Sequence, residues 1–365
     1  MLSLRVLRGS GARAAGRWLL VAAASAGTGL LLLSSLAWGL AHPGGAGHAV
    51  VRLVWCVVPA VVTVQLAVAV ARAQPARWPR LGLSAVGLGR AGVVAVAAAS
   101  AALVCAAGSA LALLVFLQLR GDVTGTAWHG VGPGLLARGR SLPPAGAATL
   151  LALVPVAAAA ATTVALREER PARHDAPGTL PWGVSLVAVG LALQVGAPRG
   201  HGMPLPSGLG SIPPLALAGW VVTAAGLVLA GPGTVHLCGR LLAAYRPGAV
   251  RLLAGRAMQH EARGIGSPLG LLTATAAAAA AAWDGAHRLG PVTSFAAALI
   301  AVCVLATSAL TLGATRDARA EPRAALQAVA ASPAVLRAAV ALRAAVLLAV
   351  VVPVTALVAA LSTYP

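Results

Sequence analysis

Nine apolar runs, each close to 20 residues long, limit what this chain can fold into. A membrane-spanning helix needs about 20 consecutive apolar residues, and in lipid a helix satisfies its own backbone groups. Only 10% of the residues are charged, against about 25% in a typical soluble domain, so a soluble globule is excluded. We therefore expect an all-α, polytopic membrane helix bundle with about nine transmembrane helices, within a range of eight to ten. The runs lie at 18–40, 50–71, 91–119, 146–166, 180–197, 212–237, 266–283, 291–314 and 339–361.

The arginines predict the orientation of the bundle, because all 27 basic residues are arginine and most of them cluster in alternate loops. An excess of arginine marks the cytoplasmic loops of membrane proteins. The expected protein is thus a multi-pass protein of the cell (plasma) membrane with its N-terminus in the cytoplasm. With this orientation, the arginines outside the cytoplasmic clusters are Arg52, Arg120, Arg138, Arg140, Arg199 and Arg288.

The first apolar run resembles a signal peptide in position, since four arginines precede it. Its apolar stretch is longer than the roughly 7–15 residues of a signal-peptide core, so we expect it to remain as a helix. The net charge of +19 also has two interpretations. Basic patches attract nucleic acids, but these arginines lie in short clusters between apolar runs. They indicate a lipid bilayer as the partner and exclude nucleic acid as one.

The chain contains an internal repeat. The same order of segments occurs in residues 1–119 and in residues 251–365. Each begins with an arginine-rich stretch, followed by two spans joined by a short outer loop, then by an arginine-rich inner segment and a third span. Both copies begin in the cytoplasm, so the two three-helix repeats are expected to be parallel. Residues 120–250 form a connecting segment with three spans, an odd number that lets the second copy start on the same side.

Catalytic and energy-coupling chemistry is absent from the sequence. None of the eight acidic residues falls in the middle of a predicted span, whereas ion-coupled carriers often place an ionisable residue there. The chain has no Lys, so it lacks the lysine of a nucleotide-binding P-loop. No nucleophile, base or metal-ligand pattern is visible, and we expect neither an enzyme nor a bound cofactor. Arg52 and Arg343 lie about one turn into their spans and are expected to snorkel to the surface.

Two inner segments carry a pattern of apolar residues behind an arginine. In the second repeat, apolar residues stand three and six positions after Arg323. The segment continues to Arg337 and then into a long apolar helix. In the first repeat, the corresponding segment runs from Arg80 to Arg90. On a helix this spacing gives a short apolar stripe with a basic edge. The residues of the pattern are Arg80, Leu83, Val86 and Arg90 in the first segment, and Arg323, Leu326, Val329, Ser332, Pro333, Leu336 and Arg337 in the second.

The second segment resembles a motif of the FtsX/MacB-like permeases of ABC transporters, in which an arginine, two spaced apolar residues, a Gly-Ala-Ser triplet and a second arginine precede a span. Ala330 stands where the motif has glycine, and the large extracytoplasmic domains of many relatives are missing. The resemblance implies that the short helices at about 76–90 and 321–337 dock onto a separate ABC ATPase subunit. ATP would then be bound only by that partner, and a second copy of the chain or a second permease would complete the membrane part.

The residues themselves leave a second interpretation open, because amphipathic helices with basic edges also lie on anionic lipid. Three functions therefore compete. The first is a permease subunit that couples ATP hydrolysis in a separate ATPase to movement of a lipophilic or peptide substrate, or to force transmission alone. The second is a non-transporting membrane scaffold. The third is a secondary carrier, which needs polar residues within the bundle, and the candidates are Thr63, Gln65, Thr162, Thr163 and Gln194.

Overall fold

The computed structural model describes residues 2–42, 46–73, 90–121, 142–167, 178–197, 203–204, 211–244, 248–281, 291–318 and 333–363. These residues form long helices and one antiparallel pair of two-residue strands, β1 (Met203–Pro204) and β2 (Ser211–Ile212). Within the described ranges, eight helices are long and apolar enough to cross a membrane, and α7 (Leu180–Val195) is a shorter apolar helix. The predicted all-α polytopic helix bundle is confirmed.

The helices pack into two compact units. Unit 1 comprises Met1–Pro171, Leu205–Gly208 and Leu289–Cys303, and unit 2 comprises the remainder. Helix α10 (Pro291–Ala318) contributes its first part to unit 1 and its second part to unit 2. The packing groups α6 (Pro144–Arg167), which the sequence analysis placed in the connecting segment, with the earlier helices of unit 1. The sequence repeat and its boundaries stay a prediction.

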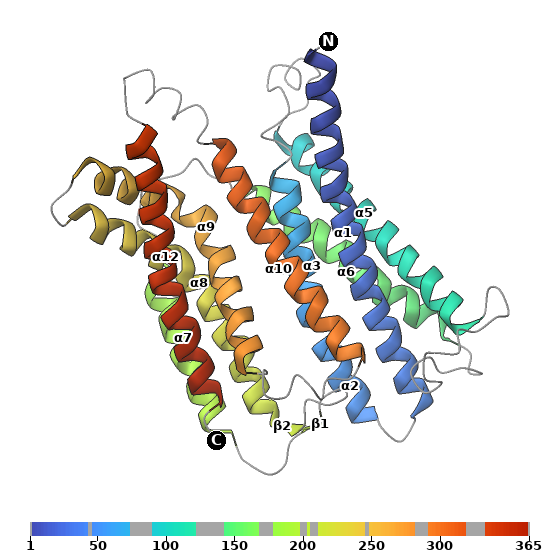
Figure 1. The fold of residues 1–365 in the computed structure, drawn as a ribbon. Coiled ribbons are helices and arrows are strands. Elements are labelled where there is room, and N and C mark those ends of the chain that lie inside the picture. Colours follow the sequence, from blue (N-terminus) through green and yellow to red (C-terminus); the bar gives the residue numbers. More distant parts are fainter. Residues whose placement is uncertain are drawn as a thin grey trace. The chain divides into compact units, whose positions relative to one another are not determined.

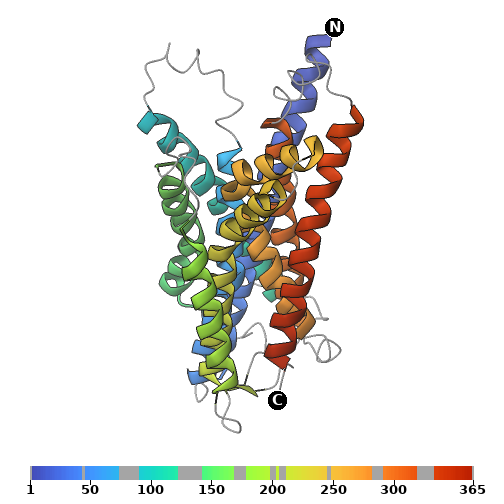
Figure 2. The same cartoon turned by 90° about the vertical axis from the view of Figure 1, so that its left-hand side faces the viewer.

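Unit 1 is built around α1, a single helix of 40 residues (Leu2–Ala41). Figures 1 and 2 show its first turns extending past the neighbouring helices of this unit. Helix α1 packs on α5, α5 packs on α6, and α3 lies against both α1 and α6. One apolar cluster joins α1, α5 and α6 through Leu33, Phe116 and Leu151. The other helices of unit 1 are α2 (Ala46–Trp55), α3 (Val57–Arg72) and α5 (Arg90–Arg120).

A proline explains why the second predicted span is divided into α2 and α3. Pro59 has no backbone N–H, so it cannot bond to the carbonyl of Trp55 four residues earlier. The helix is interrupted at Cys56, although the Cys56 N–H still donates to the Arg52 carbonyl at 3.1 Å and the Ala60 N–H to the Cys56 carbonyl at 3.2 Å. Pro59 therefore causes a break between two helices that together form one span, Ala49–Arg72.

The buried face of α1 carries a stripe of residues spaced three and four apart, and several of them have hydroxyl groups. Thr28 Oγ1 donates to the Ala24 carbonyl at 3.0 Å and lies 2.9 Å from Thr63 Oγ1 of α3, so the Thr63 hydroxyl is the donor in that second bond. Ser25 Oγ donates to the Cys105 carbonyl of α5 at 2.8 Å. Hydroxyl groups in lipid need such partners, and here they join α1 to its neighbours. The stripe consists of Val21, Ser25, Thr28, Leu32 and Ser35.

Unit 2 is held together by glycines. Helix α8 (Pro214–Ala244) packs between α7 and α9 (Ala249–Ala281), while α12 (Pro333–Thr363) packs mainly on α9 (Figures 1 and 2). A Cβ on Gly226 of α8 would lie only 2.6 Å from the Val187 N atom of α7. A Cβ on Gly239 would lie 2.7 Å from the Gly255 carbonyl oxygen of α9. Small residues thus allow the backbones to approach closely, as in many membrane helix pairs.

Helix α7, the short apolar helix of unit 2, packs mainly on α8. Its glycines Gly183 and Gly190 are buried against α8. Its other faces are exposed, with Trp182 at 75% and Val195 at 61%. Helix α7 therefore lies at the edge of unit 2. Helix α9, by contrast, lies between α8 and α12.

Candidate functional site

A buried ion pair joins α9 to α12 in unit 2. The Arg343 guanidinium donates through Nη2 to Oε2 of Glu261. The two side chains are 10% and 14% exposed. Arg343 lies well inside the apolar span Ala334–Ser362, and Glu261 lies just before the apolar span Gly264–Ala281. The pair is therefore a charged contact at the edge of a hydrophobic environment.

Each partner of the ion pair occupies a buried stripe of its own helix. On α9, Ala254, Met258 and Ile265 precede and follow Glu261 at spacings of three and four residues, and all three are buried. Residues at these spacings share one face of a helix, so Glu261 lies in line with core residues. On α12, buried Ala339 lies one turn before Arg343 on the same face. Sequence-local helix geometry thus directs both charges toward the interior of unit 2.

The surroundings of the pair are apolar. Val235 of α8, together with Met258 and Ala262 of α9, forms a buried cluster, against which Val346 and Leu347 of α12 pack. An arginine at the centre of a membrane helix costs roughly 2.5–3.5 kcal/mol on insertion scales. A carboxylate partner with a direct hydrogen bond offsets part of that cost. With Glu261 as its partner, the charged Arg343 side chain can lie inside the bundle. Arg343 is near the N-terminal end of α12, which adjoins the predicted docking segment.

A cavity of about 50 Å³ lies between α8, α9 and α12 in the same unit. Gly231 and Gly270 supply part of its wall without side chains, and Val351 of α12 lines the opposite side. Its threonines use their hydroxyl protons within their own helices: Thr234 donates to the Gly231 carbonyl and Thr273 to the Leu269 carbonyl. The lining of the cavity is thus mainly apolar. Helix α12 consequently packs less closely than α8 and α9 pack on each other.

The ion pair corrects the expectation that Arg343 snorkels to the membrane surface. The side chain is directed to Glu261 instead, because the acceptor is available on the neighbouring helix. Sequence reasoning missed Glu261. Two signals in the sequence could have identified Glu261. It lies among apolar residues at helical spacing, and an arginine within a span needs an acidic partner, of which the chain has only eight.

Most of the predicted docking residues lie outside the described residues, namely Arg80, Leu83, Val86, Arg323, Leu326, Val329 and Ser332. Arg90 is the first residue of α5, and Pro333 is the first residue of α12. Leu336 is half-buried and Arg337 is exposed, both in the first turns of α12. The docking role itself stays a prediction.

The polar residues proposed for a carrier do not meet at one place. Thr63 is buried and bonds to Thr28 in unit 1, while Gln194 Nε2 donates to Thr223 Oγ1 at 3.0 Å in unit 2. Thr163 donates to carbonyls of its own helix α6, and Gln65 is exposed. Thr162 is fully buried. The hydrogen bonds of Thr63, Thr163 and Gln194 Nε2 are those of helix packing, whereas Thr162 Oγ1 and Gln194 Oε1 are buried without a partner among the described residues.

The four cysteines lie within apolar stretches of the chain. All four are free; Cys56, Cys105 and Cys303 are buried and Cys238 is half-buried. Within the described residues, no group of three or more His, Cys, Asp or Glu side chains is placed to hold a metal ion.

Comparisons of the chain with protein-family models, curated proteins and solved structures found no match. The resemblance to FtsX/MacB-like permeases therefore rests on the sequence motif, and the site described above rests on geometry alone.

Proposed function

We propose that this chain is the integral-membrane permease subunit of an ABC transporter in the cell membrane. A separate ATPase binds short helices at about 76–90 and 321–337 on the cytoplasmic side, where the N-terminus also lies. ATP hydrolysis in that partner then moves the helices of the bundle. The work done is movement of a lipophilic or peptide substrate from the membrane, or transmission of force to another protein.

The observation that carries this proposal is the attachment of α12. This helix begins at Pro333 and contains the last residues of the docking motif, and it is joined to α9 through the buried Glu261–Arg343 pair. Its central apolar span is the least buried of the eight long spans, at 11%. A force on the segment before Pro333 acts first on a helix that packs loosely along most of its length. The ion pair is the contact through which that motion reaches α9.

This mechanism needs no ionisable group in the middle of the membrane and no catalytic residue in the chain. Coupling between distant sites is carried by packed helices and ion-pair contacts that have more than one arrangement. The glycine contacts between α8 and α9 make these two helices a closely packed body. The apolar cavity beside them gives α12 room to shift. Helix α12 then acts as a lever on that body.

The test changes the apolar stripe of the docking motif. Substitution of Leu326→Glu together with Val329→Glu places two negative charges where the partner should bind. We expect the amount of a P-loop ATPase that copurifies from native membranes to fall at least about tenfold, a loss of 1.4 kcal/mol or more in binding. The matched control is Leu135→Glu together with Leu136→Glu, in a segment expected on the outer side. Equal recovery of the ATPase with both variants would contradict the proposal.

One structural observation favours a second candidate, the secondary carrier. Sequence analysis found no acidic residue in the middle of a span, but Glu261 is only 14% exposed beside one and is paired with an arginine. Buried ionisable residues in membrane bundles mark ion or proton pathways in many carriers. The two functions differ in their energy source. Substrate uptake into ATP-free vesicles under an imposed ion gradient, lost in Glu261→Gln, would support the carrier over the permease.

A further inference from the structure

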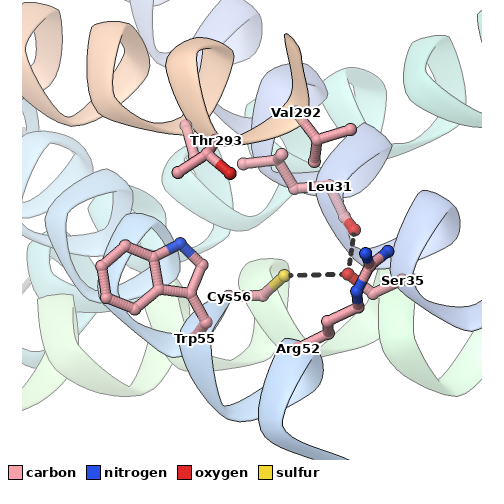
Figure 3. A pocket seen from close by; sticks show the side chains of 8 residues that line it. Leu31, Ser35, Arg52, Trp55, Cys56, Val292 and Thr293 are labelled. Carbon is pink, nitrogen blue, oxygen red and sulfur yellow. Dashed lines mark hydrogen bonds between the residues drawn. The ribbon is translucent and has the colours of Figure 1, made fainter. Parts of the chain in front are cut away.

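A small cavity in unit 1 lies between α1, α2 and the first turns of α10 (Figure 3). Its volume is about 20 Å³. On this measure, a cavity of roughly 10–15 Å³ holds one water molecule. The space therefore accepts a single particle of about that size, and a phosphate or sulfate ion is too large. The side chains around it include Leu31, Ser35, Arg52, Trp55, Cys56 and Thr293.

The indole of Trp55 supplies a donor that needs an acceptor. Its Nε1 atom is buried and has no hydrogen-bond partner among the described residues. An indole N–H can only donate, and a buried donor without a partner costs about 1–3 kcal/mol. The nearby Ser35 Oγ already donates to the Leu31 carbonyl at 2.8 Å, and the Cys56 thiol lies 3.3 Å from Ser35 Oγ (Figure 3). An acceptor in the cavity would satisfy Trp55.

The guanidinium of Arg52 supplies a positive charge at the same cavity. Its Cζ atom lies 4.1 Å from the centre of the Trp38 ring, and Trp38 stacks on His42 with 4.5 Å between ring centres. The Trp38 ring contacts the guanidinium from one side, and a cation over an aromatic face is moderately stabilised. Within the described part of the chain, no carboxylate pairs with Arg52. The charge therefore favours an anion over a neutral occupant.

We propose that this cavity binds one monatomic anion, chloride under ordinary ionic conditions. The anion accepts a hydrogen bond from Trp55 Nε1 and balances the charge of Arg52. A water molecule would satisfy Trp55 but would leave the guanidinium without a counter-charge at the edge of the membrane span. Because α1, α2 and α10 all line the cavity, the bound anion would stabilise the junction of these three helices. The site is independent of the docking helices and of the Glu261–Arg343 pair.

The first test measures binding directly, with radioactive chloride and the purified full chain in detergent. We expect saturable binding of one chloride per chain, displaced by bromide and not by sulfate. Thermal unfolding gives a second measurement at constant ionic strength. Replacement of gluconate by saturating chloride should raise Tm by about 2 °C, because a ligand that binds only the folded state stabilises it.

Matched variants locate the site. Arg52→Gln and Trp55→Phe should each abolish saturable chloride binding and the shift in Tm. Arg256→Gln and Trp182→Phe change an exposed arginine and an exposed tryptophan of unit 2, and both should keep the wild-type response. If Arg52→Gln does not fold, Trp55→Phe and the competition with bromide still test whether chloride binds in this cavity.

Three outcomes would overturn the proposal: no saturable chloride binding to the wild-type chain, binding unchanged in Trp55→Phe, or displacement by sulfate as effective as by bromide. The first indicates a water molecule only, the second a site elsewhere, and the third a larger oxyanion site.

Discussion

At the scale of single residues, the buried charge pair is the feature with the largest energetic consequence. Removal of one partner leaves the other charged and buried, which costs about 3–5 kcal/mol in comparable pairs. Replacement of both partners by apolar residues of similar size is often neutral. The contact between Glu261 and Arg343 is well enclosed, so solvent screening reduces these values little.

We therefore expect Glu261→Gln and Arg343→Met each to lower the free energy of unfolding by about 3 kcal/mol. The double variant Glu261→Leu with Arg343→Met should lose much less than the sum of the single losses, because no unpaired charge remains. Denaturant unfolding in detergent micelles measures this. Arg256→Gln is the control, since Arg256 is exposed on the same helix. Additive losses in the double variant would show that the two residues do not act as a pair.

At the scale of helices, α7 is the element whose role the sequence left least defined. Its 16 residues have a length of about 24 Å at 1.5 Å per residue, shorter than a hydrocarbon core of about 30 Å. Its glycine contacts with α8 nevertheless run along the helix from Gly183 to Gly190. Helices in contact over several turns lie side by side, and α8 is long enough to span the membrane.

We predict that α7 spans the membrane, with local thinning of the bilayer or tilted neighbours accommodating its length. In a chain whose native cysteines are replaced by alanine, a cysteine at position 178 should react only with reagent from the cytoplasmic side. A cysteine at position 197 should react only from the outside. Membrane-impermeant maleimide on intact cells and on inverted vesicles makes the measurement. Labelling of both positions from one side would show that α7 lies on the surface, and the predicted orientation of every later helix would reverse.

At the scale of the whole molecule, the division of the chain into units does not follow the order of the sequence. The first part of α10 belongs to unit 1, although about 120 residues separate it from the main part of that unit, Met1–Pro171. Its contact with α1 is close: a Cβ on Gly27 would lie 3.0 Å from Leu299 Cδ1. Unit 1 is therefore incomplete without a segment that follows most of unit 2.

This arrangement predicts how a divided chain should behave. Fragments 1–171 and 172–365, expressed together, should copurify, because residues 289–303 of the second fragment complete unit 1. Removal of residues 289–303 from the second fragment should reduce the copurified first fragment severalfold and expose it to protease. A second fragment with ten residues removed from 319–332 is the matched control. Full recovery without residues 289–303 would show that α10 does not belong to unit 1.

Hydrophobicity along the chain is sufficient to predict the helical class and, for several spans, the bounds to within a few residues. The predicted runs at 50–71, 91–119 and 146–166 match Ala49–Arg72, Ala91–Arg120 and Pro144–Arg167. The physical reason is that a lipid environment makes one local property, a sufficiently long apolar run, decide the structure. The proline break at Pro59 was predictable for a similar reason, since it depends only on a missing N–H four residues from its partner.

Which helices pack together and which charges meet could not be predicted from the sequence, because both depend on the packing of the helices in three dimensions. The edge position of α7, the inclusion of α6 and part of α10 in unit 1, and the pairing of Glu261 with Arg343 all depend on contacts between residues far apart in the chain. Hydrophobicity does not specify such contacts in a membrane, because lipid tails are as apolar as the helices. Close fit at glycines, hydroxyl bonds and ion pairs select the partners instead, and these require the position of both helices at once.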